Sequence, residues 1–231
     1  MTTFADYYEL LAAVHAHVRP KVYLEIGVHQ GHSLRLATTA ELAVGVDPAP
    51  DLRFPMPDGA RVYPTTSDQF FAGDVDGALG GQGIDLGFVD GLHFFEQSLR
   101  DFANLERWAA PEAIVLVHDC LPIDAITSSR ERTTVLWSGD VWKLVVSLRT
   151  HRPDLAISTI DVAPTGLAVI TGLDPSSTTV FDKFAELVSE LRALTYDDIL
   201  PELGQLLNVV PARWDDLVDL FAPLNTTGAG P

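Results

Sequence analysis

Two short segments of the sequence combine aspartate with histidine. The segment V-D-G-L-H-F-F-E contains Asp90 and, three residues later, His93, and the segment L-V-H-D-C contains His118 next to Asp119. Carboxylate oxygens and imidazole nitrogens together can hold a divalent cation, and an imidazole that binds no metal can act as a base near neutral pH. We therefore expect these four side chains to converge on one site.

The order of apolar and amphipathic segments predicts where that site lies. Short, almost entirely apolar runs alternate with segments of helical period, which is typical of a parallel sheet with helices on both faces. The expected strands are 22–27, 43–47, 61–63, 84–90 and 113–119, and the expected helices are 4–18, 33–40, 67–78, 96–108 and 140–150. In such sheets ligands bind outside the carboxyl ends of the strands, and Asp90 and Asp119 each end a strand.

The second half of the chain departs from this alternation. Two further strands, 155–162 and 167–172, are separated only by the turn A-P-T-G. A parallel crossover needs a dozen or more residues, so this pair must be antiparallel. Between 181 and 191 apolar residues recur at three- and four-residue steps, as in a helix. We expect an α/β domain over residues 1–174 and a C-terminal helical extension over residues 175–231.

The exit of the first strand reads Y-L-E-I-G-V-H-Q-G-H-S and holds Glu25, Gly27, Gly31 and Ser33. The glycines let the backbone turn sharply and approach a ligand, but their spacing is not the G-x-G-x-x-G of a dinucleotide-binding turn. Glu25 would repel a pyrophosphate, whereas it could accept hydrogen bonds from a ligand that bears an ammonium group. An ordinary tight turn explains the glycines equally well.

The second strand ends at Asp47, twenty residues after Gly27. An acidic side chain at this place can accept hydrogen bonds from both hydroxyls of a ribose, which any adenosine-containing ligand supplies. A single aspartate before Pro48 is also typical of a turn, so both interpretations stay open.

The charge balance disfavours two classes of partner. Thirty-two acidic residues against 15 basic ones give a net charge of −17, which repels phosphate backbones and anionic lipid headgroups, so we expect neither a nucleic acid nor a membrane partner.

The N-terminus has the pattern of an amphipathic helix rather than a signal peptide, and no segment approaches the ~20 apolar residues of a membrane span. Cys120 is the single cysteine and cannot form an intramolecular disulfide, which favours a cytoplasmic location.

Taken together, the segments Y-L-E-I-G-V-H-Q-G-H-S, V-G-V-D, T-S-D-Q-F-F, F-V-D-G-L-H-F-F-E-Q-S-L-R-D-F and V-L-V-H-D-C resemble the class I S-adenosylmethionine (SAM)-dependent methyltransferases. The resemblance is greatest to their small-molecule O-methyltransferase branch, which includes natural-product enzymes. It covers residues 20–172, and D-G-L-H with H-D is its most specific part. It implies a Rossmann-like doubly wound sheet of seven strands with an antiparallel last strand, SAM as methyl donor, and a small-molecule acceptor methylated on a hydroxyl or carboxyl oxygen.

The resemblance also implies roles for single residues. The positions that match donor-binding positions are Glu25, Gly27, Gly31 and Ser33 for the methionine part, Asp47 for the ribose, and Ser67 and Asp68 for the adenine edge, together with Asp90. For Ser67 and Asp68 a helix cap followed by an acidic first turn is an equally good explanation.

The resemblance further implies which residues take part in the reaction. It implies that His93 is the general base. Several relatives hold Mg²⁺ with acidic residues at the positions of Asp90 and Asp119, often with a further acidic residue where this chain has His118. His118 is therefore a candidate third ligand, or a group that orients the ligands, and Mg²⁺ is a candidate cofactor.

Three alternatives remain at this point. An NAD-dependent oxidoreductase is disfavoured by Glu25 and by the missing G-x-G, and a metal-dependent hydrolase is disfavoured because the H-D pair ends a strand. A non-catalytic methyltransferase-like binding protein is indistinguishable by sequence. The acceptor is not specified, although the loop 121–138 with Trp137, and also Trp142, are expected to line its pocket. The C-terminal helices could form a cap or the contact of a homo-oligomer.

Overall fold

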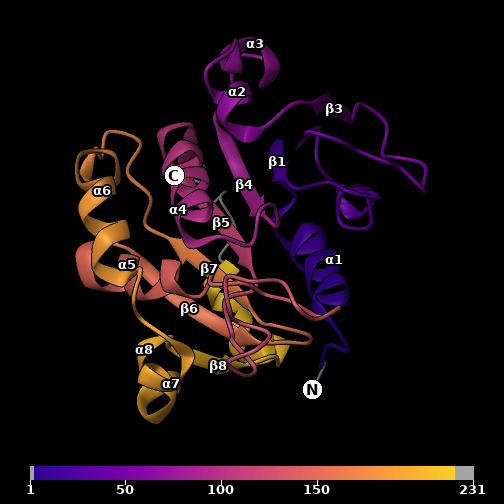
Figure 1. The fold of residues 1–231 in the computed structure, drawn as a ribbon. Helices are drawn as coiled ribbons and strands as arrows, with labels where there is room; N and C mark the ends of the chain where they lie inside the picture. Colours follow the sequence, from indigo (N-terminus) through magenta and orange to yellow (C-terminus); the bar gives the residue numbers. More distant parts are fainter. Residues whose placement is uncertain (1–2, 222–231) are drawn as a thin grey trace, which may run out of the picture.

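The computed structural model describes residues 3–221, which form one eight-stranded sheet covered by helices (Figure 1). The strands are β1 (Val22–Ile26), β2 (Leu42–Asp47), β3 (Arg61–Pro64), β4 (Ile84–Val89), β5 (Ala109–His118), β6 (Ala156–Asp161), β7 (Leu167–Thr171) and β8 (Val209–Pro211). The α-helices are α1 (Tyr7–Val18), α2 (Ser67–Phe71), α3 (Val75–Ala78), α4 (Phe95–Arg107), α5 (Lys143–His151), α6 (Thr179–Leu191), α7 (Tyr196–Ile199), α8 (Leu203–Leu206) and α9 (Trp214–Leu217). Short 3₁₀ turns are η1 (Leu34–Leu36), η2 (Leu200–Glu202) and η3 (Val218–Phe221).

The strand order is β3-β2-β1-β4-β5-β7-β6-β8. Strands β1 to β5 are mutually parallel where they pair, and β7 is antiparallel to both β5 and β6. The predicted Rossmann-like α/β class and the antiparallel hairpin are therefore confirmed. The predicted count of seven strands is wrong, because β8 adds an eighth strand parallel to β6. This strand has only three residues, V-V-P, and the last of them is proline, which has a low strand propensity. The sequence therefore gives no signal for a strand at this place.

The register of the parallel strands brings their carboxyl ends together. Ile26 of β1 lies opposite Val89 of β4, and Val89 lies opposite Val117 of β5. The residues that follow these positions, Gly27, Asp90 and His118, consequently leave the sheet side by side. The sheet thus builds the shared edge that the sequence predicts.

The helices cover the two faces of the sheet separately. Helices α4, α5 and α6 pack on one face, where their apolar side chains share a core with β1, β4 and β5. Helix α1, η1 and the segment α9–η3 cover the other face, where Leu10, Leu11 and Val14 of α1 are fully buried. Figure 1 shows α1 on the side of the sheet opposite α5 and α6.

Two predicted helices are shorter than expected. Residues 33–40 form only the turn η1, whose bonds Leu36 N–Ser33 O and Ala37 N–Leu34 O are of the 3₁₀ type. The β-branched Thr38 and Thr39 disfavour continuation of a helix. Residues 67–78 form α2 and α3, because Asp74 caps a new helix by accepting from Gly77 N.

The C-terminal segment packs on the domain. Helix α6 contacts α4 and α5, and Val180, Leu187 and Leu191 belong to the core of that face. The expectation of an entirely helical extension is corrected by β8, and residues 222–231 lie outside the described residues. A role of these helices in oligomer formation stays a prediction. No helix within residues 3–221 has the length and apolar composition that crossing a bilayer requires.

A buried ion pair joins α4 to the end of α5. Arg152 donates two hydrogen bonds of 2.7 Å to the two oxygens of Glu106, and both side chains are about 3% exposed. We predict that Arg152→Met lowers the free energy of unfolding by about 3–5 kcal/mol, since Glu106 would keep a buried, unpaired charge. Urea denaturation measures this. The matched control is Arg53→Met, which removes an exposed pair with Asp51 and should cost under about 1 kcal/mol. Equal costs for both variants would contradict the interpretation.

Candidate active site

A cavity of about 850 Å³ opens at the carboxyl ends of the parallel strands. Its lining includes residues at the ends of four strands: Asp47 ends β2, and Gly27, Asp90 and Asp119 directly follow β1, β4 and β5. Its volume lies in the range of sites that enclose a small organic ligand. The expectation that these exits converge is met by the structure.

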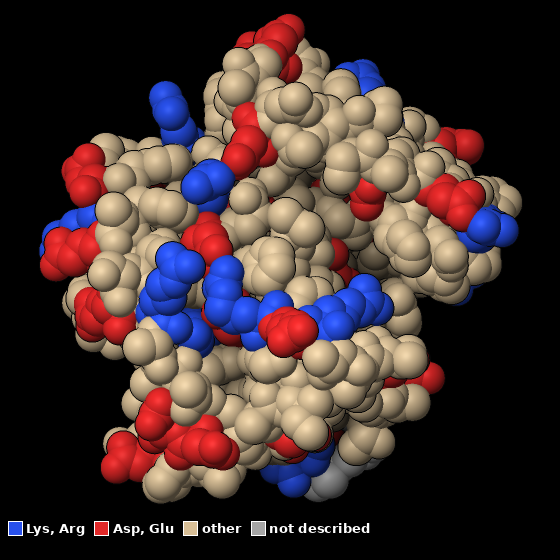
Figure 2. Space-filling view, viewed as in Figure 1, with Lys and Arg blue, Asp and Glu red and all other residues tan. Residues whose placement is uncertain are grey.

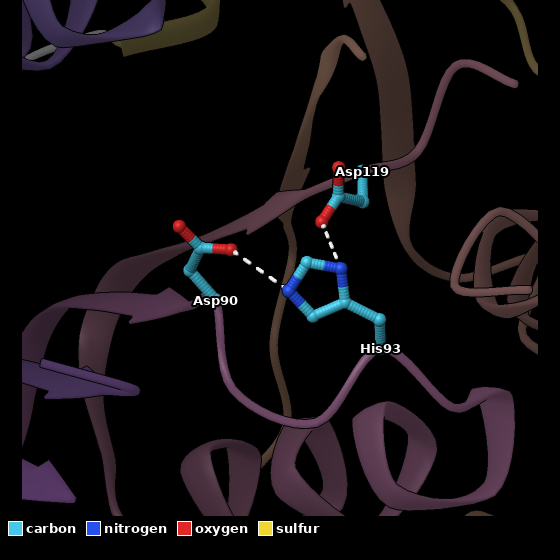
Figure 3. Close-up of side chains that lie close together, drawn as sticks. All are labelled: Asp90, His93 and Asp119. Atoms are coloured by element: carbon cyan, nitrogen blue, oxygen red, sulfur yellow. Dashed lines mark ion pairs between the residues drawn. The ribbon is translucent and has the colours of Figure 1, made fainter. Parts of the chain in front are cut away.

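Asp90, His93 and Asp119 lie close together at this cavity (Figure 3). His93 Nδ1 is 2.9 Å from Asp119 Oδ2, and His93 Nε2 is 3.8 Å from Asp90 Oδ1. Each residue offers one potential ligand atom within 4.8 Å of the others. The group can therefore hold a metal ion or bind and move a proton.

The neighbours of the His93 ring determine where its proton lies. Nδ1 is 2.8 Å from the carbonyl oxygen of Trp137 as well as near Asp119, and both neighbours only accept hydrogen bonds. Nδ1 must therefore carry a proton, which leaves Nε2 as the basic atom of the neutral ring. Burial favours the neutral ring, but the hydrogen bond to Asp119 and the charges of both aspartates outweigh it and raise the pKa of His93 above its usual 6.5.

His118 lies between the two aspartates. Its Nδ1 is 3.2 Å from Asp90 Oδ1 and 3.5 Å from Asp119 Oδ2, and its ring stacks on Tyr7 at 3.9 Å. Burial disfavours its charge, but the two aspartates outweigh burial and raise the pKa of His118 to about 10. The residue is thus a cation between two carboxylates. The group whose atoms could hold a metal contains His93 together with Asp90 and Asp119, and the role of His118 as a ligand or as a group that orients the ligands stays a prediction.

Asp119 is held by an element that the sequence did not connect with the site. It has a φ of +64°, a left-handed conformation that non-glycine residues rarely adopt. The hydroxyl of Thr165, in the turn between β6 and β7, donates to Asp119 Oδ1, and Leu121 N donates to Thr165 O at 2.7 Å. Although burial opposes it, the neighbouring His118 and His93 lower the pKa of Asp119. The carboxylate is consequently ionised and fixed.

The N-terminal helix α1 also reaches the site. The hydroxyl of Tyr7 donates to Asp90 Oδ2 at 3.3 Å, and Tyr8 lines the cavity beside it. The sequence identified α1 only as an amphipathic helix, and nothing in its pattern connects it with residues some eighty positions away. The expected contribution of Trp137 is met, whereas Trp142 is 1% exposed and outside the cavity lining.

Glu25 and Gly31 do not line the cavity, which corrects their expected contact with a ligand. Glu25 is fully buried, and its two oxygens accept hydrogen bonds of 2.7 Å from the hydroxyls of Tyr23 and Ser33. A side chain at position 31 would lie 2.7 Å from the Met56 methyl group, on the side of a neighbouring loop. Glu25 and Gly31 thus lie behind the residues that line the cavity, whereas Ser33 is part of the lining.

Gly27 lines the cavity and also meets a constraint within the protein. Its φ is +93°, and a Cβ there would lie 2.1 Å from the carbonyl oxygen of Asp90. Because Gly27 has no side chain, the backbone after β1 can lie against the backbone after β4. The position of Asp90 depends on it.

The remaining predicted residues line the cavity. The Asp47 carboxylate accepts hydrogen bonds of 2.7 Å from the backbone N–H groups of His29 and Ala49, as expected of a turn residue. Asp47 also lines the cavity, so both interpretations of this residue hold. Ser67 and Asp68 also line the cavity. The cap of α2 is Thr66, which accepts from Gln69 N, and this corrects the interpretation of Ser67 as the cap.

The lining of the cavity is strongly acidic. Its charged side chains, apart from histidines, are Asp6, Asp47, Asp68, Asp90, Asp101, Asp119 and Arg132. On the face shown in Figure 2, acidic side chains lie in scattered groups, and Lys and Arg gather in a short row across its middle. A cavity lined mainly by negatively charged side chains favours a cationic ligand over a pyrophosphate.

The comparisons with known proteins agree with this geometry. Residues 24–120 match a family model described as a methyltransferase domain. This segment is therefore similar to methyltransferase domains. It spans β1 to β5 and contains all three residues of the Asp90–His93–Asp119 group. No curated protein sequence matches the chain.

Solved structures extend the likeness beyond this segment. The O-methyltransferase TomG from Streptomyces achromogenes, in complex with SAM, is 15% identical with a TM-score of 0.54, over 71% of this chain and 79% of that one. The SAH-bound methyltransferase PaMTH1 from Podospora anserina is 15% identical with a TM-score of 0.55, over 71% and 76%. The O-methyltransferase from Bacillus cereus, in complex with SAH, is 8% identical with a TM-score of 0.53, over 71% and 80%. The chain shares the fold of these enzymes.

The buried Glu25 makes stability depend on pH. Burial outweighs its two hydrogen bonds and raises the pKa of Glu25 to about 8, from 4.5. Between these values the unfolded chain releases a proton that the folded chain keeps, so stability falls as pH rises from 4.5 to about 8. We predict that Glu25→Gln raises the free energy of unfolding by a few kcal/mol at pH 7 and has no such effect at pH 4. Urea denaturation at both pH values measures this, and a loss of stability at pH 7 would contradict it.

Proposed function

We propose that this protein transfers a methyl group from SAM to a hydroxyl or carboxyl oxygen of a small molecule, with His93 as the general base. The observation that carries the proposal is the Asp90–His93–Asp119 group in the wall of an acidic cavity, within a segment similar to methyltransferase domains. The acceptor would enter the same cavity.

The electrostatics of the cavity support SAM as donor. The sulfonium and ammonium groups of SAM are cationic, and the cavity has six aspartates against one arginine. Asp47 would bind the ribose, and Gly27 and Ser33 would adjoin the methionine part, with Glu25 holding Ser33 from behind. Structures of the same fold contain SAM or SAH, as TomG and PaMTH1 do.

The chemistry that SAM supplies when bound is an electrophilic methyl group on a good leaving group. The protein must hold the acceptor oxygen in line with that methyl group and remove its proton. His93 Nε2 suits this role, because Nδ1 is held by Asp119 and Trp137 while Nε2 is not bound to either. Asp119 would orient the ring and stabilise the imidazolium that forms. Because imidazole is a weak base, the expected acceptor hydroxyl is an acidic one.

A divalent cation fits the same group. Asp90 and Asp119 would supply oxygen ligands, and His93 beside them would stay unligated so that its Nε2 can accept the proton. When bound, the cation would lower the pKa of the acceptor hydroxyl. Carboxylate oxygen ligands suit magnesium or manganese. His118, as a cation beside both carboxylates, competes with the cation for them.

His93→Ala should lower kcat by about 10²–10⁴-fold and leave the dissociation constant of SAH nearly unchanged, because it removes the base and leaves the donor wall intact. Single-turnover rates over a panel of phenols and hydroxy acids measure the loss. Melting temperatures of His93→Ala and His93→Gln serve as the control for a merely structural role. A variant with wild-type turnover would rule out His93 as the base.

Removal of metal tests the cation separately. We predict that dialysis against EDTA lowers turnover and that Mg²⁺ or Mn²⁺ restores it. Because His93 is not a ligand in this mechanism, His93→Ala should leave Mn²⁺ binding, measured by electron paramagnetic resonance, nearly unchanged. Full turnover in excess EDTA would remove the cation from the mechanism and leave proton transfer to His93 alone.

A further inference from the structure

Helix α4 begins two residues after His93, and its own sequence does not cap it. The N-cap residue is Phe94, whose side chain cannot accept a hydrogen bond. The first backbone N–H groups of a helix have no acceptor within the helix. Phe95 N instead donates a buried hydrogen bond of 2.9 Å to Oδ1 of Asp140, 45 positions later in the chain. Asp140, in the loop that joins β5 to α5, therefore caps α4 from outside.

The Asp140 side chain is held in place by two cations. It is 2% exposed, and its Oδ2 lies 2.8 Å from Arg130 Nη1 and 3.2 Å from Lys143 Nζ. Arg130 also donates hydrogen bonds of 2.6 and 2.8 Å to the two oxygens of Glu96, in the first turn of α4. The loop is thus tied to the start of α4 at two points, the Phe95 N–H group and the Glu96 carboxylate.

The same loop contacts His93 directly. The Trp137 carbonyl oxygen lies 2.8 Å from His93 Nδ1, and the Trp137 ring stacks on the imidazole with 5.2 Å between centroids and 4° between planes. Gly139, next to Asp140, has a φ of +59°, and a Cβ there would lie 1.9 Å from the His93 carbonyl oxygen. The backbone of the loop therefore lies against the backbone of His93, so the place of the loop determines the place of the ring.

We propose that Asp140 is a positioning residue for methyl transfer, which by capping α4 keeps His93 against the Trp137 carbonyl and leaves Nε2 available to the acceptor. This inference rests on the proposed function, because it takes His93 to be the general base. Asp140 is not part of the cavity lining, so it acts through His93 and touches no ligand. A displacement of about 1 Å at a reacting group can cost about a hundredfold in rate.

The experiment compares Asp140→Ala with Asp140→Asn. Both variants remove the negative charge beside Lys143, but only Asn keeps an oxygen that can accept from Phe95 N. We expect kcat of Asp140→Ala to lie about tenfold to a hundredfold below that of Asp140→Asn, with the Kd of S-adenosylhomocysteine nearly equal in both. If the lost ion pair prevents folding, the same two substitutions are made together with Lys143→Met, which also removes the buried cation.

A cap far from the cavity serves as the matched control. Asp74 caps α3 by accepting from Gly77 N at 3.0 Å, and it does not line the cavity. Asp74→Ala should lower the melting temperature and leave kcat nearly unchanged, which separates loss of a cap in general from displacement of His93.

A double variant tests whether Asp140 acts through His93. In the His93→Ala background, Asp140→Ala should lower kcat no further, because the group that it positions is already absent. A merely structural role would lower kcat by the same factor in both backgrounds. That result, or equal kcat values for Asp140→Ala and Asp140→Asn, would overturn the inference.

Nuclear magnetic resonance gives a readout that needs neither donor nor acceptor. The ¹H–¹⁵N signal of His93 Nδ1–H, assigned by its absence from His93→Gln, should be present in wild-type protein and in Asp140→Asn. Asp140→Ala should lose it through exchange with water. Absence of the signal from wild-type protein, or an unchanged signal in Asp140→Ala, overturns the inference. A signal that depends on Asp140, in a protein that neither binds S-adenosylhomocysteine nor methylates any acceptor, would support the positioning of His93 and contradict the proposed function.

Discussion

The mutual repulsion of Asp90 and Asp119 is the constraint on which the site depends. Parallel pairing of β4 with β5 brings the two carboxylates to one edge, where both face the same imidazoles. Two carboxylates so close together in a partly buried site would not both stay ionised unless cationic groups compensated their charge. His93 and His118 provide that compensation, which explains why both histidines have raised pKa values despite their burial.

The rest of the site serves to hold these four groups. Tyr7 from α1 stacks on His118 and donates to Asp90, Thr165 from the β6–β7 turn donates to Asp119, and the loop before α5 places the Trp137 carbonyl against His93. Each of these elements lies outside the strand exits themselves. Residues 24–120, which match the family model, therefore contain the four groups, and segments on either side of this range fix their positions.

The sequence predicted what depends on local pattern. Buried strands and the short A-P-T-G turn determined the sheet and its hairpin, and the strand exits located Asp90, His93 and Asp119 correctly. It failed where the deciding contact is long-range or where the signal is weak. Tyr7 meets Asp90 across 83 positions, the three residues of β8 lack a strand pattern, and the burial of Glu25 between two hydroxyls depends on packing that no spacing encodes. The place of His118 has the same origin, since only the folded geometry shows that its ring lies between the two aspartates.

The central claim is that an acidic cavity at the ends of parallel strands binds a cationic adenosine-containing donor and not a dinucleotide. Calorimetric titration of the wild-type protein with SAM, S-adenosylhomocysteine and NAD at equal ionic strength tests it most directly. The account predicts one equivalent of SAM or S-adenosylhomocysteine bound per chain and no heat from NAD. Binding of NAD with no response to either adenosyl compound would contradict it.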